Sequence, residues 1–287
     1  MEFIHVTSNN REQTLLQTKP GVVALGFFDG VHLGHKQVIK EAKRAAEEQG
    51  LPLIIMSFFP HPKEVLTNGK SIIPYLMPVN EKRRIFEELG ADYFYLIEFT
   101  KEFAALPPRE FVRTYLLDFG VKKVAAGFDF TYGHRGAGNM DTIECDSNGK
   151  IEGMKVDKIE WEGEKVSSTL IRNLVLSGEM EKIAPYLGND YQIEGRIFFR
   201  NKQLEIKLDP YYLMPASGCY EVIVSLHQET ATDIAVVSDG RLTLLHGQGC
   251  PFYEGERVRL SWKRVLPYEF VHDKVLRQVL GVSILSQ

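Results

Sequence analysis

Two histidines three residues apart, His32 and His35, stand in the most distinctive segment of the chain, GFFDGVHLGH (Gly26–His35). The segment follows an apolar run and precedes a helical pattern, so we expect it at a strand-to-helix turn. The amides and the dipole at the start of a helix favour anions, and glycines let a phosphate approach the backbone. Imidazoles at such a turn can donate to phosphate oxygens and stabilise charge that develops during transfer. The alternatives are two ordinary surface histidines, or a metal site, which lacks a third local ligand.

A second polar run, VSSTLIR, covers Val166–Arg172. Ser167, Ser168 or Thr169 can cap a following helix and leave amides and hydroxyls for phosphate. Arg172 comes one helical turn after Thr169, so its planar guanidinium can clamp the same anion. Taken alone, the run also fits an ordinary helix cap followed by a solvated arginine.

Aromatic residues and glycines dominate a third segment, GFDFTYGHRGAGN (Gly127–Asn139), which follows the apolar run Val124–Ala126. The aromatics, Phe128 and Tyr132 among them, can stack on a flat ring, and Asp129 can hold a ribosyl or ribityl hydroxyl. The glycines suit a mobile loop. A solvent-exposed hairpin is the alternative interpretation.

A fourth segment, FFPHP (Phe58–Pro62), closes another apolar run and is expected at the same rim of the fold. Phe58 and Phe59 are typical of a core, whereas His61 is presented rigidly between two prolines. The sequence contains no Gly-x-x-x-x-Gly-Lys-Ser/Thr loop, which disfavours a P-loop kinase.

The elements that must position these residues alternate between strand and helix in the first half of the chain. Such alternation predicts a parallel sheet with helices on both faces, and ligands bind at the carboxyl ends of its strands. The polar segments fall at those ends. The predicted strands cover Val22–Leu25, Leu53–Phe59, Tyr93–Phe99 and Val124–Ala126, and the predicted helices run from about Val38 to Gly50, from Asn80 to Gly90 and from Pro107 to about Phe119.

The pattern changes after about Leu187, where short strand-like runs alternate with Gly, Asn, Asp and Pro. This is typical of an antiparallel barrel or sandwich. A boundary near Gly188-Asn189-Asp190 divides the chain into domains 1–188 and 189–287. The predicted strands of the second domain cover Ile193–Phe199, Leu204–Leu208, Tyr220–Leu226, Ile234–Val237, Leu242–Leu245 and Val258–Trp262.

Composition limits the classes of partner and the location of the protein. The chain has 287 residues, enough for about two domains. Its 34 Lys and Arg against 38 Asp and Glu give a net charge of −4, which disfavours a nucleic-acid binder. Its apolar runs are far shorter than the ~20 residues of a membrane helix, and no signal peptide is visible. Three cysteines without CxxC spacing predict free thiols in a reducing cytoplasm, with neither a zinc site nor a disulfide framework.

Taken in this order, GFFDGVHLGH, FFPHP, GFDFTYG and VSSTLIR resemble the prokaryotic bifunctional riboflavin kinase/FAD synthetase family over about residues 20–185. The HxGH element alone marks the wider nucleotidylyltransferase superfamily. The resemblance implies a Rossmann-like nucleotidylyltransferase domain followed by a small barrel. It also implies an enzyme, an FMN adenylyltransferase, that transfers AMP from ATP to FMN with Mg²⁺ and without an enzyme nucleophile.

The resemblance also implies a role for each motif. Two histidines and one aspartate would be catalytic, and the remaining residues would bind the substrates. His32 and His35 would stabilise the α-phosphate, and Asp129 would lie near the transfer centre and the metal. The residues expected to bind ATP or FMN are Gly26, Phe27, Asp29, Gly34, His61, Phe128, Tyr132, Ser167, Ser168, Thr169 and Arg172.

The second domain departs from the family pattern. The riboflavin kinase domain carries a GxPTAN loop that holds Mg-ATP, whereas the corresponding stretch here, Gly195–Leu204, lacks Pro-Thr-Ala-Asn. We therefore expect a barrel that keeps its fold but has no kinase activity and acts as a scaffold or regulatory lid; the sequence leaves open whether it binds riboflavin or FMN. The alternatives are a bifunctional enzyme, a non-catalytic flavin- or nucleotide-sensing regulator, and adenylylation of another phosphate acceptor such as phosphopantetheine.

Overall fold

The computed structural model describes residues 1–70, 73–200, 203–209, 211–227, 229–245 and 252–267. The chain forms two compact units, and neither is a continuous stretch of sequence. The first comprises Met1–Ile73 and Val79–Val166, and the second comprises Pro74–Pro78 and the chain from Ser167 onward. The domain boundary at residues 188–189 stays a prediction.

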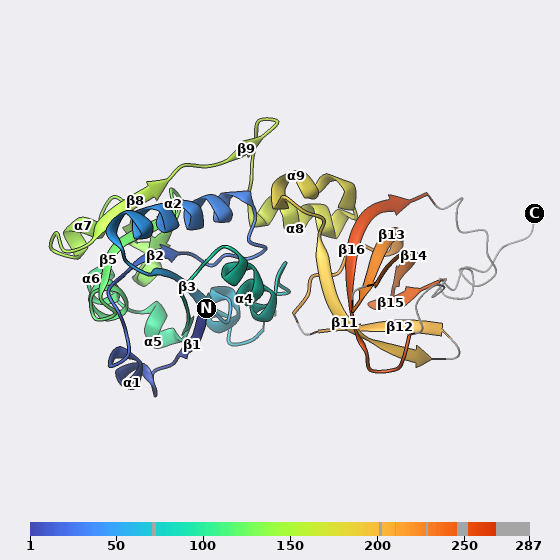
Figure 1. Cartoon of the computed structure of the whole chain (residues 1–287), viewed down its shortest axis with the longest axis horizontal. Helices are drawn as coiled ribbons and strands as arrows, with labels where there is room; N and C mark the ends of the chain where they lie inside the picture. The colour runs from blue at the N-terminus through green and yellow to red at the C-terminus, as the bar shows by residue number, and fades with distance from the viewer. Residues whose placement is uncertain (71–72, 201–202, 210, 228, 246–251, 268–287) are drawn as a thin grey trace, which may run out of the picture. The chain divides into compact units, whose positions relative to one another are not determined.

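Six strands of the first unit form one parallel sheet (Figure 1). Their order is β1-β4-β3-β2-β5-β8, so the chain moves outward from β2 through β3 to β4 and then returns to the other side of β2. The predicted α/β class with a parallel sheet is therefore confirmed. The strands are β1 (Glu2–Val6), β2 (Gly21–Leu25), β3 (Leu53–Phe59), β4 (Tyr93–Glu98), β5 (Val121–Gly127) and β8 (Glu152–Val156).

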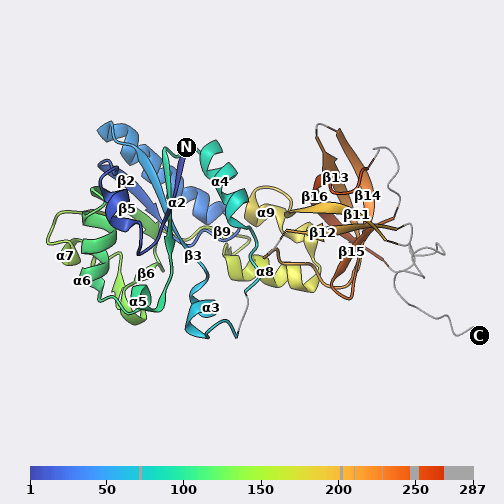
Figure 2. The same cartoon turned by 90° about the horizontal axis from the view of Figure 1, so that it is seen from below.

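The helices of the first unit cover both faces of the sheet, because the central strands carry apolar side chains on both sides. All five residues of β2 are buried. Val23 and Leu25 belong to a core that includes Phe111 and Val112, whereas Val22 and Ala24 point to the opposite face, which α2 covers (Figure 2). The helices are α1 (Arg11–Leu15), α2 (Leu33–Gln49), α3 (Pro62–Leu66), α4 (Val79–Glu88), α5 (Lys101–Ala104), α6 (Pro108–Phe111), the π-helical turn η1 (Val112–Leu117) and α7 (Ile143–Asp146).

The longest helix shows how local sequence sets the elements around the site. His32 caps the start of α2, and Val38, Ile39 and Ala42 repeat at helical spacing and are buried. Gly50 ends the helix in the left-handed conformation that glycine adopts without strain. Two short hairpins complete the first unit: β6 (Thr131–Tyr132) with β7 (Gly138–Asn139) around the 3₁₀ turn η2 (His134–Gly136), and β9 (Glu160–Trp161) with β10 (Glu164–Lys165).

The second unit contains a closed six-stranded antiparallel barrel, which confirms the predicted small barrel. Its strand order is β11-β12-β15-β14-β13-β16. Tyr75, from the segment that interrupts the first unit, forms a bridge with Tyr212. The elements are α8 (Ser168–Ser177), η3 (Met180–Lys182), α9 (Ala184–Leu187), β11 (Gln192–Arg200), β12 (Gln203–Leu208), β13 (Gly218–Leu226), β14 (Glu229–Ser238), β15 (Arg241–Leu244) and β16 (Arg257–Leu266).

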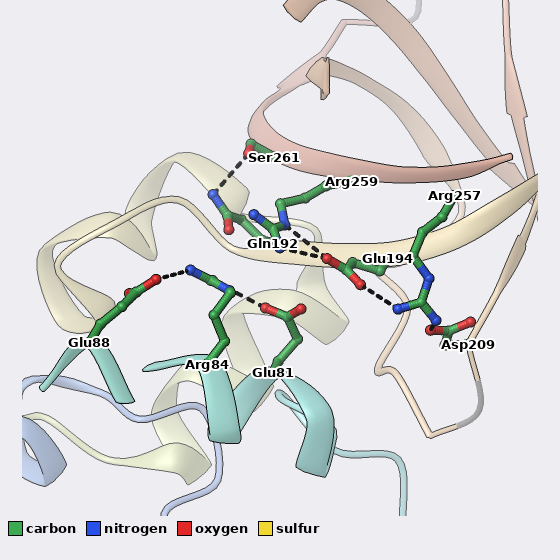
Figure 3. Close-up of polar contacts among 9 residues, drawn as sticks. All are labelled: Glu81, Arg84, Glu88, Gln192, Glu194, Asp209, Arg257, Arg259 and Ser261. Carbon is green, nitrogen blue, oxygen red and sulfur yellow. Dashed lines mark hydrogen bonds and ion pairs between the residues drawn. The ribbon is translucent and has the colours of Figure 1, made fainter. Parts of the chain in front are cut away.

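Each unit has ion pairs between side chains on its surface, and Figure 3 shows one group from each. On β16, Arg259 pairs with Glu194 of β11 at 2.6 Å, and Arg257 pairs with Glu194 at 3.1 Å and with Asp209. These contacts bridge the seam between two paired barrel strands. In the first unit, Arg84 pairs with two glutamates on its own helix, α4, at the spacing that stabilises exposed helices.

Among the described residues, no helix is long and apolar enough to cross a membrane. Cys145 is exposed and Cys219 is buried, and both are free thiols. Cys250 lies outside the described residues. The cytoplasmic location stays a prediction.

Candidate active site

The turn between β2 and α2 has a constrained backbone. Phe28 and Val31 have φ angles of 51° and 42°, in the left-handed region that disfavours side chains with a Cβ. Phe28 is fully buried, and its ring packs edge-on against His35 at 5.3 Å and against Phe86 of α4 at 5.8 Å. Packing on both sides therefore holds a conformation that the chain would otherwise avoid, a feature that clusters at functional sites.

The two histidines of the turn are brought together as a stacked pair. Their ring centroids lie 3.5 Å apart with an interplanar angle of 17°. The Nδ1 atom of His32 accepts a hydrogen bond from the backbone N–H of His35 at 3.3 Å. The proton of neutral His32 is therefore assigned to Nε2, which becomes its donor toward a ligand. A Cβ on Gly34 would lie only 3.1 Å from the His32 ring, so glycine leaves room for the stack.

His35 carries an unsatisfied polar atom. Within the described residues, its Nδ1 is buried and has no hydrogen-bond partner. Buried polar atoms are nearly always satisfied in folded proteins, so an orphan beside a helix N-terminus makes this turn a candidate site for a ligand. The long helix α2 adds its amides and dipole at this point.

Both imidazoles are held neutral. Burial, with a smaller contribution from the Lys165 ammonium, lowers the pKa of His32 to about 4. Burial, followed by the neighbouring His32 and then Lys82, lowers the pKa of His35 well below its usual value. Neutral imidazoles still donate one N–H each, so the pair can bind phosphate oxygens without itself carrying charge.

We expect the ring signals of His32 and His35 not to titrate between about pH 5.5 and 8 in NMR spectra of the ligand-free protein. The unfolded chain takes up a proton at His32 near pH 6.5, whereas the folded protein does so only near pH 4. The free energy of unfolding is therefore expected to fall as the pH drops from about 6.5 toward 4. His32→Gln assigns the signals, and a ring that titrates near pH 6.5 would contradict the arrangement.

Behind the turn, two charged side chains are buried. Asp29 is 3 % exposed, and Lys82 of α4 is 2 % exposed. The Lys82 Nζ donates to the carbonyl oxygen of Phe27 at 2.8 Å. Sequence reasoning missed Lys82 because it stands in a run of charged residues that reads as a solvated helix face. The signal that could have found it is its spacing of four residues from the buried Phe86.

Asp129 lies directly after β5, at the same carboxyl edge of the sheet. Its carboxylate accepts a hydrogen bond from Lys165 at 2.5 Å and is 59 % exposed. The Lys165 ammonium also lies 4.6 Å from the centroid of the Phe128 ring. Phe128, Asp129 and Lys165 therefore form one exposed cluster, of which Lys165 was not predicted.

A cavity of about 660 Å³ opens at this edge of the first unit. Most of its lining is aromatic, with Phe27 as the residue that it shares with the turn. Tyr132 contributes its ring, while its hydroxyl donates to Asp146 at 2.7 Å and is fixed there. The lining residues are Phe27, Phe58, His61, Pro62, Leu66, Phe99, Phe103, Ala104, Phe111, Phe130, Thr131, Tyr132, Gly133, His134, Arg135 and Gly136.

His61 joins the cavity to the turn. It caps α3 by accepting from the backbone N–H of Lys63 at 3.1 Å, and its ring meets Phe27 edge-on at 4.8 Å. The segment Thr131–Asn139 forms the hairpin that was the alternative interpretation, and its turn also lines the cavity. Phe128 is not part of that lining.

The run Ser167–Arg172 belongs to the second unit. Ser167 caps α8 by accepting from the backbone N–H of Leu170 at 3.2 Å. Ser168 and Thr169 begin the helix, and the Arg172 guanidinium donates to the carbonyl of Pro74. Ser167, Ser168 and Thr169 thus lie at one helix N-terminus, with Arg172 about one turn further on, and their role toward a phosphate stays a prediction.

The described part of the chain contains no group of three His, Cys, Asp or Glu side chains that could hold a metal ion. Mg²⁺, however, is commonly held by one or two carboxylates together with substrate phosphates. The Asp129 carboxylate is accessible and could supply one ligand to a metal ion that is otherwise bound by nucleotide phosphates.

Comparison with known proteins decides the family. The family model described as FAD synthetase matches residues 15–170, which include the turn, the cavity and the start of α8. The chain belongs to the FAD synthetase family. It is thus an enzyme of the nucleotidyltransferase class, and the predicted family is confirmed.

Curated relatives of this chain agree. A protein of Listeria monocytogenes named bifunctional riboflavin kinase/FMN adenylyltransferase is 38% identical, over 75% of this chain and 71% of its own length. One of the same name from Bacillus subtilis is 37% identical, over 80% and 75%. A second Listeria monocytogenes protein, named FAD synthetase, is 30% identical over 86% of this chain and 97% of its own length.

A solved structure shares the fold. It is described as a macrolide-efflux protein from Streptococcus pneumoniae and superposes with a TM-score of 0.80, covering 93% of this chain and 91% of its own. Its sequence identity is 24%, so the likeness concerns the fold alone.

Proposed function

We propose that this enzyme transfers AMP from ATP to FMN, forming FAD and pyrophosphate, and that it has no riboflavin kinase activity. The observation that carries the proposal is the stacked pair of neutral imidazoles at the N-terminus of α2, next to an aromatic cavity. Phe27 lies in the same turn as the histidines and also lines the cavity. A nucleotide phosphate at the histidines and a flavin in the cavity would therefore meet at this turn.

In the proposed reaction, an oxygen of the FMN phosphate attacks the α-phosphorus of ATP in line. The new phosphorus–oxygen bond forms as the bond to the β-phosphate oxygen breaks, and pyrophosphate leaves with that electron pair. No side chain becomes covalently attached. His32 donates from Nε2, and His35 offers its ring N–H, to the α-phosphate oxygens, where charge accumulates in the transition state.

The substrate ends would be held by other residues. Ser167, Ser168, Thr169 and Arg172 would bind the β- and γ-phosphates through one capped helix N-terminus and one planar cation. Gly26 would shape the turn that holds the nucleotide, because a Cβ there would lie 3.0 Å from the Phe28 ring and push the turn outward.

The cavity supports a flavin as the acceptor. Its volume of about 660 Å³ is that of an ordinary small-molecule site, and six phenylalanines and one tyrosine are among its sixteen lining residues. Aromatic walls suit a planar, polycyclic ring, whereas the flexible chain of phosphopantetheine would gain little from them. Asp129, whose carboxylate is exposed outside the cavity lining, would hold a ribityl hydroxyl or the metal.

Mg²⁺ would enter as the ATP complex, with Asp129 as the carboxylate that meets it. When bound, the ion would neutralise phosphate charge and favour departure of pyrophosphate. For this, Asp129 must exchange its contact with Lys165 for the ion.

Two observations support the absence of kinase activity. Where the riboflavin kinase family has its GxPTAN loop, the described residues instead form paired strands, with Gly195 opposite Leu208 and Arg200 opposite Gln203. In addition, the relative named only FAD synthetase is matched over 97% of its length, more than the 71% and 75% of the two relatives named bifunctional.

Product analysis tests the proposal. Mg-ATP with FMN is expected to yield FAD and one pyrophosphate per FAD, whereas Mg-ATP with riboflavin is expected to yield no FMN. The flavins are separated by chromatography, with a bifunctional enzyme as the positive control for FMN formation. FMN produced from riboflavin at a rate comparable to FAD synthesis would contradict the second half. Flavin binding without any FAD would favour the sensing alternative.

A further inference from the structure

Lys82 is the one charged residue of α4 that the described fold buries. Its neighbours Glu81, Arg83 and Arg84 are partly or fully accessible, whereas Lys82 is 2 % exposed. Phe86, one turn further on, is fully buried against Phe28. The same face of α4 therefore presents an ammonium and a phenyl ring to the two consecutive phenylalanines of the turn.

The ammonium fixes the turn from behind. Lys82 Nζ donates to the Phe27 carbonyl at 2.8 Å and lies 4.7 Å from the centroid of the Phe27 ring. The buried hydroxyl of Ser57 donates to the same carbonyl at 2.9 Å. Lys82 also attracts the buried Asp29 carboxylate. Two residues of the turn are thus held by one charge.

We propose that Lys82 is a positioning residue for the transfer reaction: its buried ammonium fixes Phe27 and Asp29 so that the histidine pair and the flavin cavity keep one relative geometry. This inference rests on the proposed function. Lys82 itself does not touch substrate in the proposal. It acts through Phe27, which forms cavity wall, and through the backbone that leads to His32.

Stability alone does not call for a lysine here. Burying an ammonium costs free energy, and apolar replacements of buried charges are often neutral or stabilising. A charge at this position, however, acts on the site. It is one cause of the lowered pKa of His35, and it would also attract a phosphate held at the imidazoles.

The charge state of Lys82 gives the proposal a measurable signature. Burial lowers the pKa of Lys82 to about 8, while the Asp29 carboxylate opposes this shift. The titratable groups that face it are Asp29 from the turn and His35 from α2. Below pH 8 the ammonium is charged, and above it the charge is lost. Because kcat/KM reports the free enzyme, kcat/KM for FAD formation is expected to decline as the pH rises above about 8.

Three variants test the role. Lys82→Met, which keeps the volume and removes the charge, is expected to lower kcat/KM about tenfold or more and to abolish the alkaline decline. Lys82→Arg, whose guanidinium stays protonated, is expected to move the decline to higher pH. Arg83→Met removes the same charge from the exposed, adjacent position and is expected to behave as wild type. Thermal unfolding is followed for all three.

Wild-type kcat/KM and a wild-type pH profile in Lys82→Met would overturn the proposal. If that variant fails to fold, Lys82→Arg decides: an alkaline decline at the wild-type position would equally overturn it. A wild-type protein that makes no FAD from FMN would instead refute the proposed function, so the two failures are distinguishable.

Discussion

Replacing His35 with alanine is expected to lower kcat for FAD formation roughly 10²–10³-fold while changing FMN binding little. The reason is that an N–H donor aimed at the α-phosphate gains strength as charge builds there, so its loss falls on the transition state. Steady-state kinetics with each substrate varied separately measures the effect, and titration of flavin fluorescence measures binding.

Two further variants make this result specific. His35→Gln retains an N–H donor and is expected to lose less than His35→Ala. His5→Ala, at an exposed position of β1, removes an imidazole outside the site, and this variant is expected to keep full activity. A kcat for His35→Ala within about threefold of wild type would show that the imidazole is structural.

Filling the cavity is the second large effect that we expect. Ala104, at the end of α5, lines the cavity, so Ala104→Trp would place an indole where the flavin ring is proposed to lie. KM for FMN is expected to rise at least about tenfold, a loss of about 1.4 kcal/mol or more in binding. KM for ATP should stay near its wild-type value.

The adjacent residue provides the matched control. Ala105 is exposed, follows α5, and is not among the residues that line the cavity, so Ala105→Trp adds the same indole outside it. Unchanged FMN kinetics are expected for this variant. If Ala104→Trp left KM for FMN unchanged, the flavin would have to bind elsewhere.

Much of the fold followed from apolar periodicity. The run Leu53–Phe59 was predicted as a strand and is β3 with the same bounds, and Gly50 ends α2 as expected. The strand β1 was not predicted because it is an edge strand, with residues that alternate only weakly between buried and exposed. The predicted helix after Pro107 is divided, because the α-helical hydrogen-bond pattern gives way to a π-helical turn at Val112.

The site divides in a similar way. The spacing of His32 and His35 at a strand-to-helix turn predicted a shared site, since an N-cap side chain folds back onto the residue three positions further on. The walls of the cavity could not be predicted. Phe58, expected in the core, and Phe103, from a distant segment, both contribute to it, and tertiary packing alone brings them together.

The route of the backbone has a consequence for the order in which this protein can fold during synthesis. Tyr75 donates its backbone N–H to Tyr211 and accepts from Leu213 at 2.9 Å, so a segment made early depends on partners translated much later. On the ribosome, the parallel sheet can assemble before Pro74–Pro78 has the residues to which it bonds. The entropic cost of closing so long a loop rises only slowly with its length. The backbone hydrogen bonds of Tyr75 are therefore expected to form only after Tyr211 and Leu213 have been synthesised, and the early segment stays exposed to chaperones or proteases until then.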